Sequence, residues 1–311
     1  MPAAGTYANG QQLTVDAALK QPQRLSRELT ALANKRLVSR RLFVRGPAVT
    51  GGSIEYERSQ SIFMDREAET IAERAKWPRA GMSEDIRQAR VNQWGLEFPV
   101  SNLSIRRNRT DVLRRGMVKL GNTLAKRIDG AAMAVLEGDA DIQSQSASAV
   151  WTAAGTDIIA DLGLAQEKIE TQDEGYDGFE GATLVLHTNL RDSLLNNTVL
   201  RNALPRETND GQIRTGMMAP FLGLREIIFT PRITPTLALL IDTNVAGTVV
   251  DEIPDPQEGW TTFNPDATVD PIYTMVYPDP TTKEQVVAAG RWPAFFLTDP
   301  KAVVKITGVS A

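Results

Sequence analysis

The side chains that could carry out chemistry are few in this chain and do not form a set. There is one histidine, His187, and no cysteine, which excludes disulfides, thiolate metal sites and any site built on a histidine pair. His187 stands in the apolar run LVLHTNL, where a lone histidine is more often structural than catalytic. No second histidine is available as the base for a serine nucleophile.

Paired carboxylates are the other candidates, because two acids can act as general acid and general base. Three pairs occur: Asp139 with Asp141, Glu167 with Glu170, and Asp173 with Glu174. Their surroundings are polar, so a solvated face or loop is the favoured interpretation. No phosphate-binding loop is present, since GMVKLGN lacks the strand and turn that such a motif requires. We therefore expect no enzyme, no cofactor and no metal.

Composition limits the remaining classes. The 311 residues are 42 % hydrophobic and 23 % charged, an ordinary globular balance that allows one large core or two modest ones. No apolar stretch approaches the ~18 residues of a membrane span. The segment MPAAGTYANGQQLTVDAAL has no basic cap followed by an apolar run, so we expect neither a signal peptide nor a membrane partner.

Charge is divided unevenly along the chain. Residues 1–130 hold 23 basic and 13 acidic residues, a net of +10, and the remainder holds 11 basic and 25 acidic, a net of −14. Two solvated faces of opposite sign are one interpretation. The other places the basic half of one copy against the acidic half of its neighbour, because complementary potentials fix register. A dedicated nucleic-acid binder is disfavoured, since no zinc finger or RNA-binding aromatic motif occurs.

The elements that would position these residues begin with a basic arm, residues 1–45. Within it, 16–45 have helical spacing, with an apolar stripe of leucines and a cationic opposite face. Such a stripe could lie on a membrane surface, but it more often docks on protein.

An extended loop, residues 46–97, follows. Residues 53–63 alternate polar and apolar like a strand, residues 86–100 are extended again, and the segment between them is charged. A two-stranded hairpin is marginal alone in water, and this one has too few apolar residues for its own core. We expect a second polypeptide of the same kind to complete it.

A long helix from Arg109 to Gly138 is the strongest local signal. Its apolar residues recur at spacings of three and four: Leu113, Met117, Leu120, Leu124, Ile128, Ala131 and Val135. Three residues could cap its start: Asn108, Thr110 or Asp111. Three glycines are expected to mark close packing or a gentle bend: Gly116, Gly121 and Gly130. At 1.5 Å per residue the helix would be about 40 Å long.

Residues 155–250 alternate helical and strand signals, as a compact α/β lobe does, after the polar linker DADIQSQSAS. Helices are expected at 158–169 and 190–204. Strands are expected in ATLVLHTNL, GLREIIFTPRI and TLALLIDTNVAGTVV. The tail, 251–311, is rich in proline and has strand candidates in DPIYTMVY, RWPAFFLT and AVVKITGV.

The order of these parts resembles the major capsid protein of tailed bacteriophages, the Hong Kong phage coat fold that encapsulin shells share. Three features carry the resemblance, which spans nearly the whole chain. FPVSN leads into the long helix, which closes on Leu136-Glu-Gly138. LVLHTNLRDSLL precedes GLREII, and PKAVVKITG lies near the C-terminus. Each is weak alone, and their order and spacing make the match specific.

The resemblance implies an α+β fold of five parts: the N-terminal arm 1–45, the extended β-hairpin loop 46–97, a peripheral domain 98–154 with the spine helix, an α/β axial domain 155–250, and C-terminal strands 251–311 completing both domains. Axial lobes would meet at five-fold and six-fold centres, and the loop and arm would reach over neighbouring subunits. The expected subunit contacts are Arg40, Arg41, Tyr56, Phe63, Lys76, Trp77 and Trp94. Some members cross-link a loop lysine to an asparagine of another subunit, but a solvated charge at the tip accounts for Lys76.

The implied function is a coat subunit that forms pentamers and hexamers of an icosahedral shell around double-stranded DNA, assembled in the bacterial host cytoplasm. The implied partners are many copies of itself, a portal, a separate scaffolding protein and, non-specifically, the packaged DNA. Two alternatives stay open: an encapsulin-like compartment holding enzyme cargo, and a soluble α/β enzyme with an unusual arm.

Overall fold

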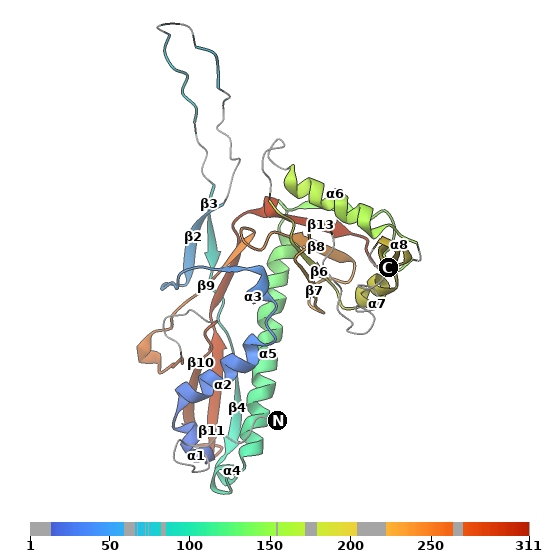
Figure 1. The fold of residues 1–311 in the computed structure, drawn as a ribbon. Helices are drawn as coiled ribbons and strands as arrows, with labels where there is room; N and C mark the ends of the chain where they lie inside the picture. Colours follow the sequence, from blue (N-terminus) through green and yellow to red (C-terminus); the bar gives the residue numbers. More distant parts are fainter. Residues whose placement is uncertain are drawn as a thin grey trace.

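A computed structural model describes residues 14–58, 66, 68–71, 73, 75–81, 85–153, 155–171, 179–203, 222–263 and 270–310. Phe63, Asp173 and Glu174 lie outside these ranges. The described chain forms an elongated part built along one long helix, a second lobe beside the end of that helix, and a hairpin that points away from both (Figure 1).

The long helix is α5, Thr110–Gly138, and it runs the length of the elongated part (Figure 1). A short helix, α4 (Asn102–Arg106), precedes it, and Ser101 caps α4 by accepting the backbone N–H of Ser104. The FPVSN step therefore begins a helix as expected, but the chain turns once more before the spine helix starts.

The expected caps of α5 are wrong. Arg109 occupies the N-cap position and makes no capping hydrogen bond with its side chain. Asn108 has a positive φ of 48°, and its Oδ1 accepts the N–H of Val15 at 2.8 Å. Its side chain therefore ties the N-terminal segment to the start of the spine helix instead of satisfying the helix itself.

The buried stripe of α5 keeps its expected spacing from Leu113 to Ile128 and then changes direction. Beyond that point the buried hydrophobic residues are Ala132, Met133 and Leu136, whereas the expected Ala131 and Val135 are only half-buried. The change has a packing cause, because the first part of the helix belongs to one hydrophobic core and its last turns belong to another.

Three antiparallel strands lie along α5, in the order β10 (Tyr273–Asp279), β11 (Glu284–Arg291) and β4 (Trp94–Ser101). Strand β11 is missed by the sequence patterns, because only Val286 and Val287 of its eight residues are β-branched and its second half, Ala288-Ala289-Gly290, consists of small residues. Gly116 of α5 is needed here, since the Phe98 ring occupies the place where a β-carbon would stand.

The N-terminal segment folds onto its own subunit. It forms helices α1 (Val15–Leu19), α2 (Pro22–Asn34) and α3 (Ser39–Leu42) and the short strand β1 (Val44–Arg45), not one continuous helix. The apolar face of α2 is buried against α5 and β10, with Leu25, Leu29 and Ala33 in the first core. The amphipathic pattern is thus used for docking on protein.

The second lobe contains a five-stranded sheet in the order β5-β13-β8-β6-β7. Its strands are β5 (Gln143–Ser146), β6 (Thr183–Leu186), β7 (Glu226–Phe229), β8 (Leu237–Ile241) and β13 (Val303–Thr307). Its helices are α6 (Ile158–Glu170), α7 (Leu190–Asn196) and α8 (Thr198–Ala203). Strand β5 lies within the segment expected to be a polar linker, and β13 shows that the C-terminal strand belongs to the middle of this sheet.

Alternation along these strands builds two cores. Leu184, Leu240 and Val304 face the core that contains α6, while Val185 and Leu239 face the core that contains the end of α5. The sheet is therefore buried on both faces, which explains the uninterrupted apolar runs of its strands.

A third sheet joins the two parts. It has the order β1-β9-β12, with β9 at Gly247–Asp251 and β12 at Pro293–Leu297. Strand β9 lies in the range expected for the axial domain, yet it pairs with the arm and the tail. Short 3-10 turns occur at Pro256–Glu258 and Pro300–Ala302.

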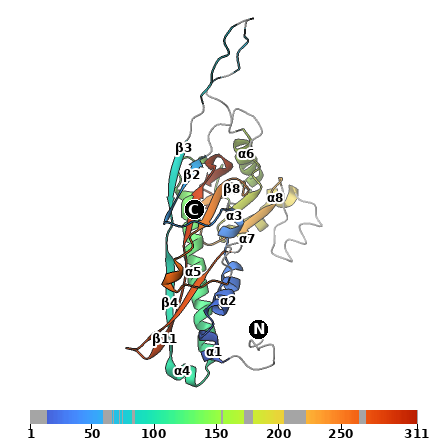
Figure 2. The same cartoon turned by 90° about the vertical axis from the view of Figure 1, so that its left-hand side faces the viewer.

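The expected hairpin is formed by β2 (Ser53–Arg58) and β3 (Asp85–Arg90), paired antiparallel with Ser53 opposite Arg90. It is shorter than expected, because the second extended run divides into β3 and β4. Strand β4 pairs with β11 in the sheet along α5 and not with the hairpin. The described residues beyond β2 and β3 extend away from the body in both views (Figures 1 and 2).

Candidate assembly surfaces

The base of the hairpin is fixed to its own subunit by charge. Arg58, whose side chain is 4 % exposed, lies 2.8 Å from carboxylate oxygens of both Asp139 and Asp141, just after the C-terminal end of α5. This corrects the interpretation of those two acids as merely solvated. Burial raises the pKa of Asp139, but the hydrogen bonds from Arg58 and from the Asp141 N–H, with the charges of Arg58 and Arg87, together hold that pKa below its ordinary value.

An aromatic contact supports the same place. The ring of Tyr56 stacks on Phe296 of β12, with centroids 4.2 Å apart and an angle of 27° between the rings. Burial raises the pKa of the Tyr56 phenol. Gly51 and Gly52 donate their N–H groups to Glu252 Oε1 at 3.2 and 2.9 Å. The hairpin base is thus held by contacts within the chain, whereas the expectation was that a second polypeptide completes the hairpin.

The tip of the hairpin has no such support. Trp77 is 78 % exposed, Lys76 beside it is exposed, and the two line an open hollow of about 330 Å³ with Arg66, Glu69 and Pro78 among its other residues. Since the tip points away from the body (Figure 2), the indole of Trp77 has no core of its own chain to enter. Phe63 lies outside the described residues.

Arg40 and Arg41 both have partners within the chain. Arg41 forms an ion pair with Glu226 of β7, and Arg40 Nε lies 3.8 Å from Asp270 Oδ2. Both arginine side chains are about half exposed. Both arginines therefore form ion pairs within their own subunit. Only the exposed half of each side chain is left to contact a neighbour.

The partner of Arg40, Asp270, belongs to a buried network of ion pairs. Arg291, 1 % exposed, donates two hydrogen bonds to Asp251 at 2.7 and 2.9 Å and one to Asp270 at 2.7 Å. Arg45 of β1 donates to Asp251 at 2.9 Å. Burial would lower the pKa of Arg291, but the charges of both aspartates raise it above its ordinary value. Burial, with the charge of Asp251, raises the pKa of Tyr273 to about 12.

A second buried acid fixes the arm to the spine helix. The Asp129 carboxylate accepts the N–H groups of Val38 at 3.0 Å and Ser39 at 2.9 Å, which are donors at the start of α3. Burial raises the pKa of Asp129, and these hydrogen bonds oppose the rise. The sequence patterns assign no role to Arg58, Asp129 or Arg291. Only Arg58 had a usable signal, because it alternates in phase with Ile54 and Tyr56.

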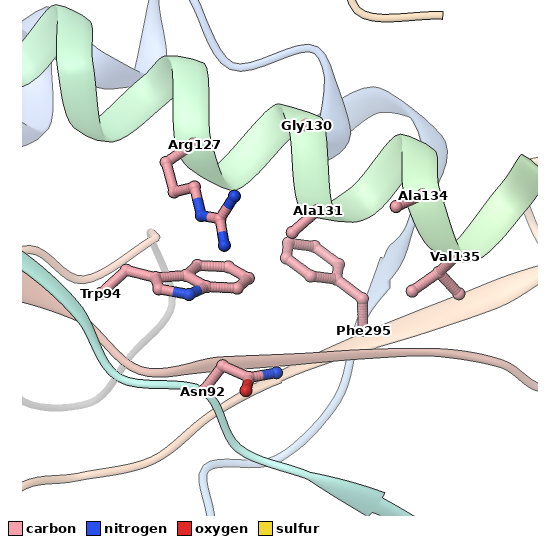
Figure 3. A pocket seen from close by; sticks show the side chains of 8 residues that line it. All are labelled: Asn92, Trp94, Arg127, Gly130, Ala131, Ala134, Val135 and Phe295. Atoms are coloured by element: carbon pink, nitrogen blue, oxygen red, sulfur yellow. The ribbon is translucent and has the colours of Figure 1, made fainter. Parts of the chain in front are cut away.

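Trp94 lines a hollow on the side of α5 that faces the base of β4. This hollow of about 240 Å³ lies between Trp94 and Phe295 on one side and Arg127, Ala131 and Val135 of α5 on the other (Figure 3). The guanidinium of Arg127 lies 5.6 Å from the Trp94 ring centroid. Gly130 also lines the hollow, and a β-carbon there would meet nothing within 4 Å.

The described residues do not assemble the other chemical candidates into a site. His187 lies one residue beyond β6, half-buried, and its Nδ1 accepts the N–H of Asn189 at 3.2 Å. Glu167 and Glu170 are exposed on α6. Across the described ranges, no three His, Asp or Glu side chains are grouped as a metal site would require. No described helix is both long and apolar enough to cross a membrane.

Solved structures of similar fold come from virus particles. The structure of Mycobacterium phage Che8 has 15 % identity, covers 88 % of this chain and 92 % of its own, and has a TM-score of 0.61. The capsid of cyanophage P-SCSP1u has 11 % identity, coverage of 88 % and 89 %, and a TM-score of 0.63. A virus-like particle from Pyrococcus furiosus has 14 % identity, coverage of 91 % and 98 %, and a TM-score of 0.57.

No curated protein sequence matches the chain. The family described as phage capsid protein matches residues 84–306, from β3 to the last strand of the second lobe. The match includes the spine helix α5, the sheet β10-β11-β4 and most of the five-stranded sheet, which are parts that the sequence resemblance also used. The chain belongs to the phage capsid protein family, and its fold is the phage capsid fold.

Proposed function

We propose that this chain is the major capsid protein of a tailed phage and that its copies form the pentamers and hexamers of an icosahedral shell around double-stranded DNA. The observation that carries the proposal is the hairpin. Its base is fixed by Arg58 and Tyr56, while the described residues beyond β2 and β3 extend away from the body and include Trp77, which is 78 % exposed. A large exposed aromatic on a projecting element is the kind of anchor that protein interfaces use.

A projecting hairpin suits a contact in which each subunit places its hairpin on the next subunit, in the same direction around a ring. A hairpin that leaves one subunit and lies on the next makes a heterologous interface, and such interfaces close into rings when the rotation permits. A rigid base supports this use, because a docked element whose base is already ordered loses less entropy on binding. Tyr56 and Arg58 would then set the direction of the hairpin, and Trp77 and Lys76 would contact the neighbour.

The proposed partners are other copies of the chain, a portal, a separate scaffolding protein and the packaged DNA, with assembly in the cytoplasm of the bacterial host. An encapsulin-like compartment is the second candidate, because a virus-like particle from an archaeon shares the fold. The family match and the phage structures favour the coat of a phage.

Electron microscopy of the purified full-length protein tests the proposal. We expect closed shells with pentameric and hexameric clusters, and nuclease-protected duplex DNA in particles taken from infected cells. Particles that hold a protein cargo and no DNA would support the compartment instead. A monomer that forms no shell under any assembly condition would contradict both.

A further inference from the structure

Positive charge is concentrated on α4 and the first two thirds of α5. Residues 102–128 contain one acidic residue, Asp111, and eight basic ones: Arg106, Arg107, Arg109, Arg114, Arg115, Lys119, Lys126 and Arg127. All eight are exposed. The segment has a net charge of +7, so the rest of a chain with net charge −4 carries −11. We call the exposed side of this segment the basic crest.

The crest has a regular geometry. Arg115, Lys119 and Lys126 are spaced by four and seven residues, so they lie along one line of the helix, opposite the buried stripe. Asn122 and Thr123 are exposed between them and carry no charge. At 1.5 Å per residue the line from Arg115 to Lys126 is about 17 Å long, which places a row of cations on a rigid support.

Little within the described chain neutralises these cations. Arg115 pairs with Asp111 at 2.8 Å, but both side chains are about two thirds exposed, so the pair contributes little. Arg127 lies over the ring of Trp94, which is not an anionic partner. Among the described residues, no carboxylate forms an ion pair with the other crest cations, Arg106, Arg107, Arg109, Lys119 and Lys126, leaving Arg114 aside.

The chemistry of the crest favours phosphate over a protein surface. Protein interfaces have an apolar centre, whereas Leu103, at one end of the crest, is its one exposed large hydrophobic residue. Nucleic-acid interfaces are more polar and much more positive. Six of the eight cations are arginine, whose planar fork matches a phosphate group. A line of cations without base-reading side chains suits duplex DNA of any sequence.

We propose that the basic crest is the surface on which the packaged duplex lies, bound through its phosphates. The inference rests on the proposed shell function and adds an orientation to it: the exposed face of the spine helix (Figure 1) points into the particle. Lys119 and Lys126 contact phosphates there, and the strongly acidic remainder of the subunit keeps the overall attraction weak enough for DNA to enter and leave.

Lysine footprinting of intact particles tests the orientation. An amine-acetylating reagent is applied to DNA-filled particles and to the same particles after DNA release, and modification is read by mass spectrometry. We expect Lys119 and Lys126 to be several-fold more reactive in the emptied particles, while Lys283, on the connection between β10 and β11, changes little. If both crest lysines stay protected after DNA release, an acidic surface of a neighbouring copy covers them and the inference is wrong, although the shell itself stands.

A matched pair of variants tests the contact directly. Lys119→Gln with Lys126→Gln removes two crest cations, and Arg90→Gln with Lys283→Gln removes two exposed cations elsewhere. Binding of unassembled subunits to a fluorescent 20-base-pair duplex is measured against salt concentration. The slope of log K against log salt should fall by about 1.8 for the crest variant, at about 0.9 per lost phosphate contact, and by much less for the control. The inference would be overturned by equal slopes in the two variants. It would also be overturned if the crest lysines of the unassembled subunit bound poly-glutamate but not the duplex.

Discussion

Individual buried charges define how distant segments of this chain meet. Arg58 joins the hairpin to the end of α5, Asp129 joins the arm to the middle of α5, and Arg291 joins the tail to β9 and β1. Each contact links residues at least 40 positions apart. A buried charge without its partner is costly, so these contacts exclude other arrangements of the same segments.

The buried guanidinium of Arg291 gives the first prediction. Arg291→Met removes the cation that both Asp251 and Asp270 face, and breaking a buried pair from one side costs about 3–5 kcal/mol. We expect a loss of this size in urea unfolding of the unassembled subunit. Arg225→Met is the control, because its pair with Glu180 is mostly exposed and should be worth less than about 1 kcal/mol. If both variants lost a similar free energy of unfolding, burial of the Arg291 ion pairs would not be the cause of the destabilisation.

Asp139 gives a prediction for pH. Its folded-state pKa lies below the ordinary value, so its ionised form stabilises the fold above the unfolded-state pKa of about 3.9. That contribution is lost as the pH falls through the lower, folded-state pKa. We expect the hairpin base to open to pepsin below about pH 4 in the wild type. Asp139→Asn should open it already at neutral pH, as judged by a neutral protease, while Asp111→Asn, in an exposed pair, should behave like the wild type.

At the scale of elements, the long helix serves two cores, and its glycines show how. Gly116 stands where the Phe98 ring fills the space of a β-carbon, whereas Gly130 faces the hollow and would meet nothing within 4 Å. The expectation was that the helix glycines mark close packing or a gentle bend. Close packing is confirmed for Gly116 and is not found at Gly130, where the bend stays a prediction. One pattern in the sequence had two different causes in the structure.

The two glycines provide a matched pair of substitutions in one helix. Gly116→Ala should destabilise the subunit by about 1–3 kcal/mol, because overpacking moves Phe98. Gly130→Ala should stabilise it by up to about 1 kcal/mol, since alanine is the better helix former and space is available. Thermal unfolding of the unassembled subunit measures both. The same sign of change in the two variants would contradict this account of the packing.

The sequence predicts those elements whose own residues specify them. The spine helix has its apolar spacing from Leu113 to Ile128, and the buried strands β6 and β8 have uninterrupted apolar runs. It does not predict β11, whose second half consists of small residues that lie between two neighbouring strands. It does not predict β5 either, because the polar sequence QSQS is a strand through its pairing with β13. Hydrophobic periodicity indicates which face of an element is buried. Strands β5 and β11 depend instead on pairing with strands that are distant in the sequence.

The candidate surfaces divide in the same way. The hairpin could be predicted from its alternation and its missing apolar residues, and the basic helix from its composition. The ion pairs of Arg40, Arg41 and Arg58 could not, because each depends on which distant acid the fold brings near. Of the six expected contact residues that the structure describes, only the exposed Trp77 and Lys76 are wholly available to a neighbour.

At the scale of the whole molecule, folding and assembly are assigned to different parts. None of the described residues between positions 44 and 93 belongs to the three hydrophobic cores, so the described hairpin contributes only the contacts at its base to the stability of the subunit. The tip is therefore free to be specified by a partner. A subunit should be able to lose the tip, remain folded, and lose only the capacity to associate.

Deleting residues 60–85 tests this separation. The variant should unfold within a few degrees of the wild type, because no described residue of the deleted segment belongs to a hydrophobic core and the cores supply most of the stability. It should form no closed shells, as judged by electron microscopy and sedimentation. Trp77→Ala is the finer test: since truncating a central aromatic anchor can cost about 2–4 kcal/mol of binding energy, we expect assembly to require a several-fold higher protein concentration. Shells of wild-type size from the deletion variant would show that copies associate without the hairpin, and that its exposed tryptophan serves something other than the shell.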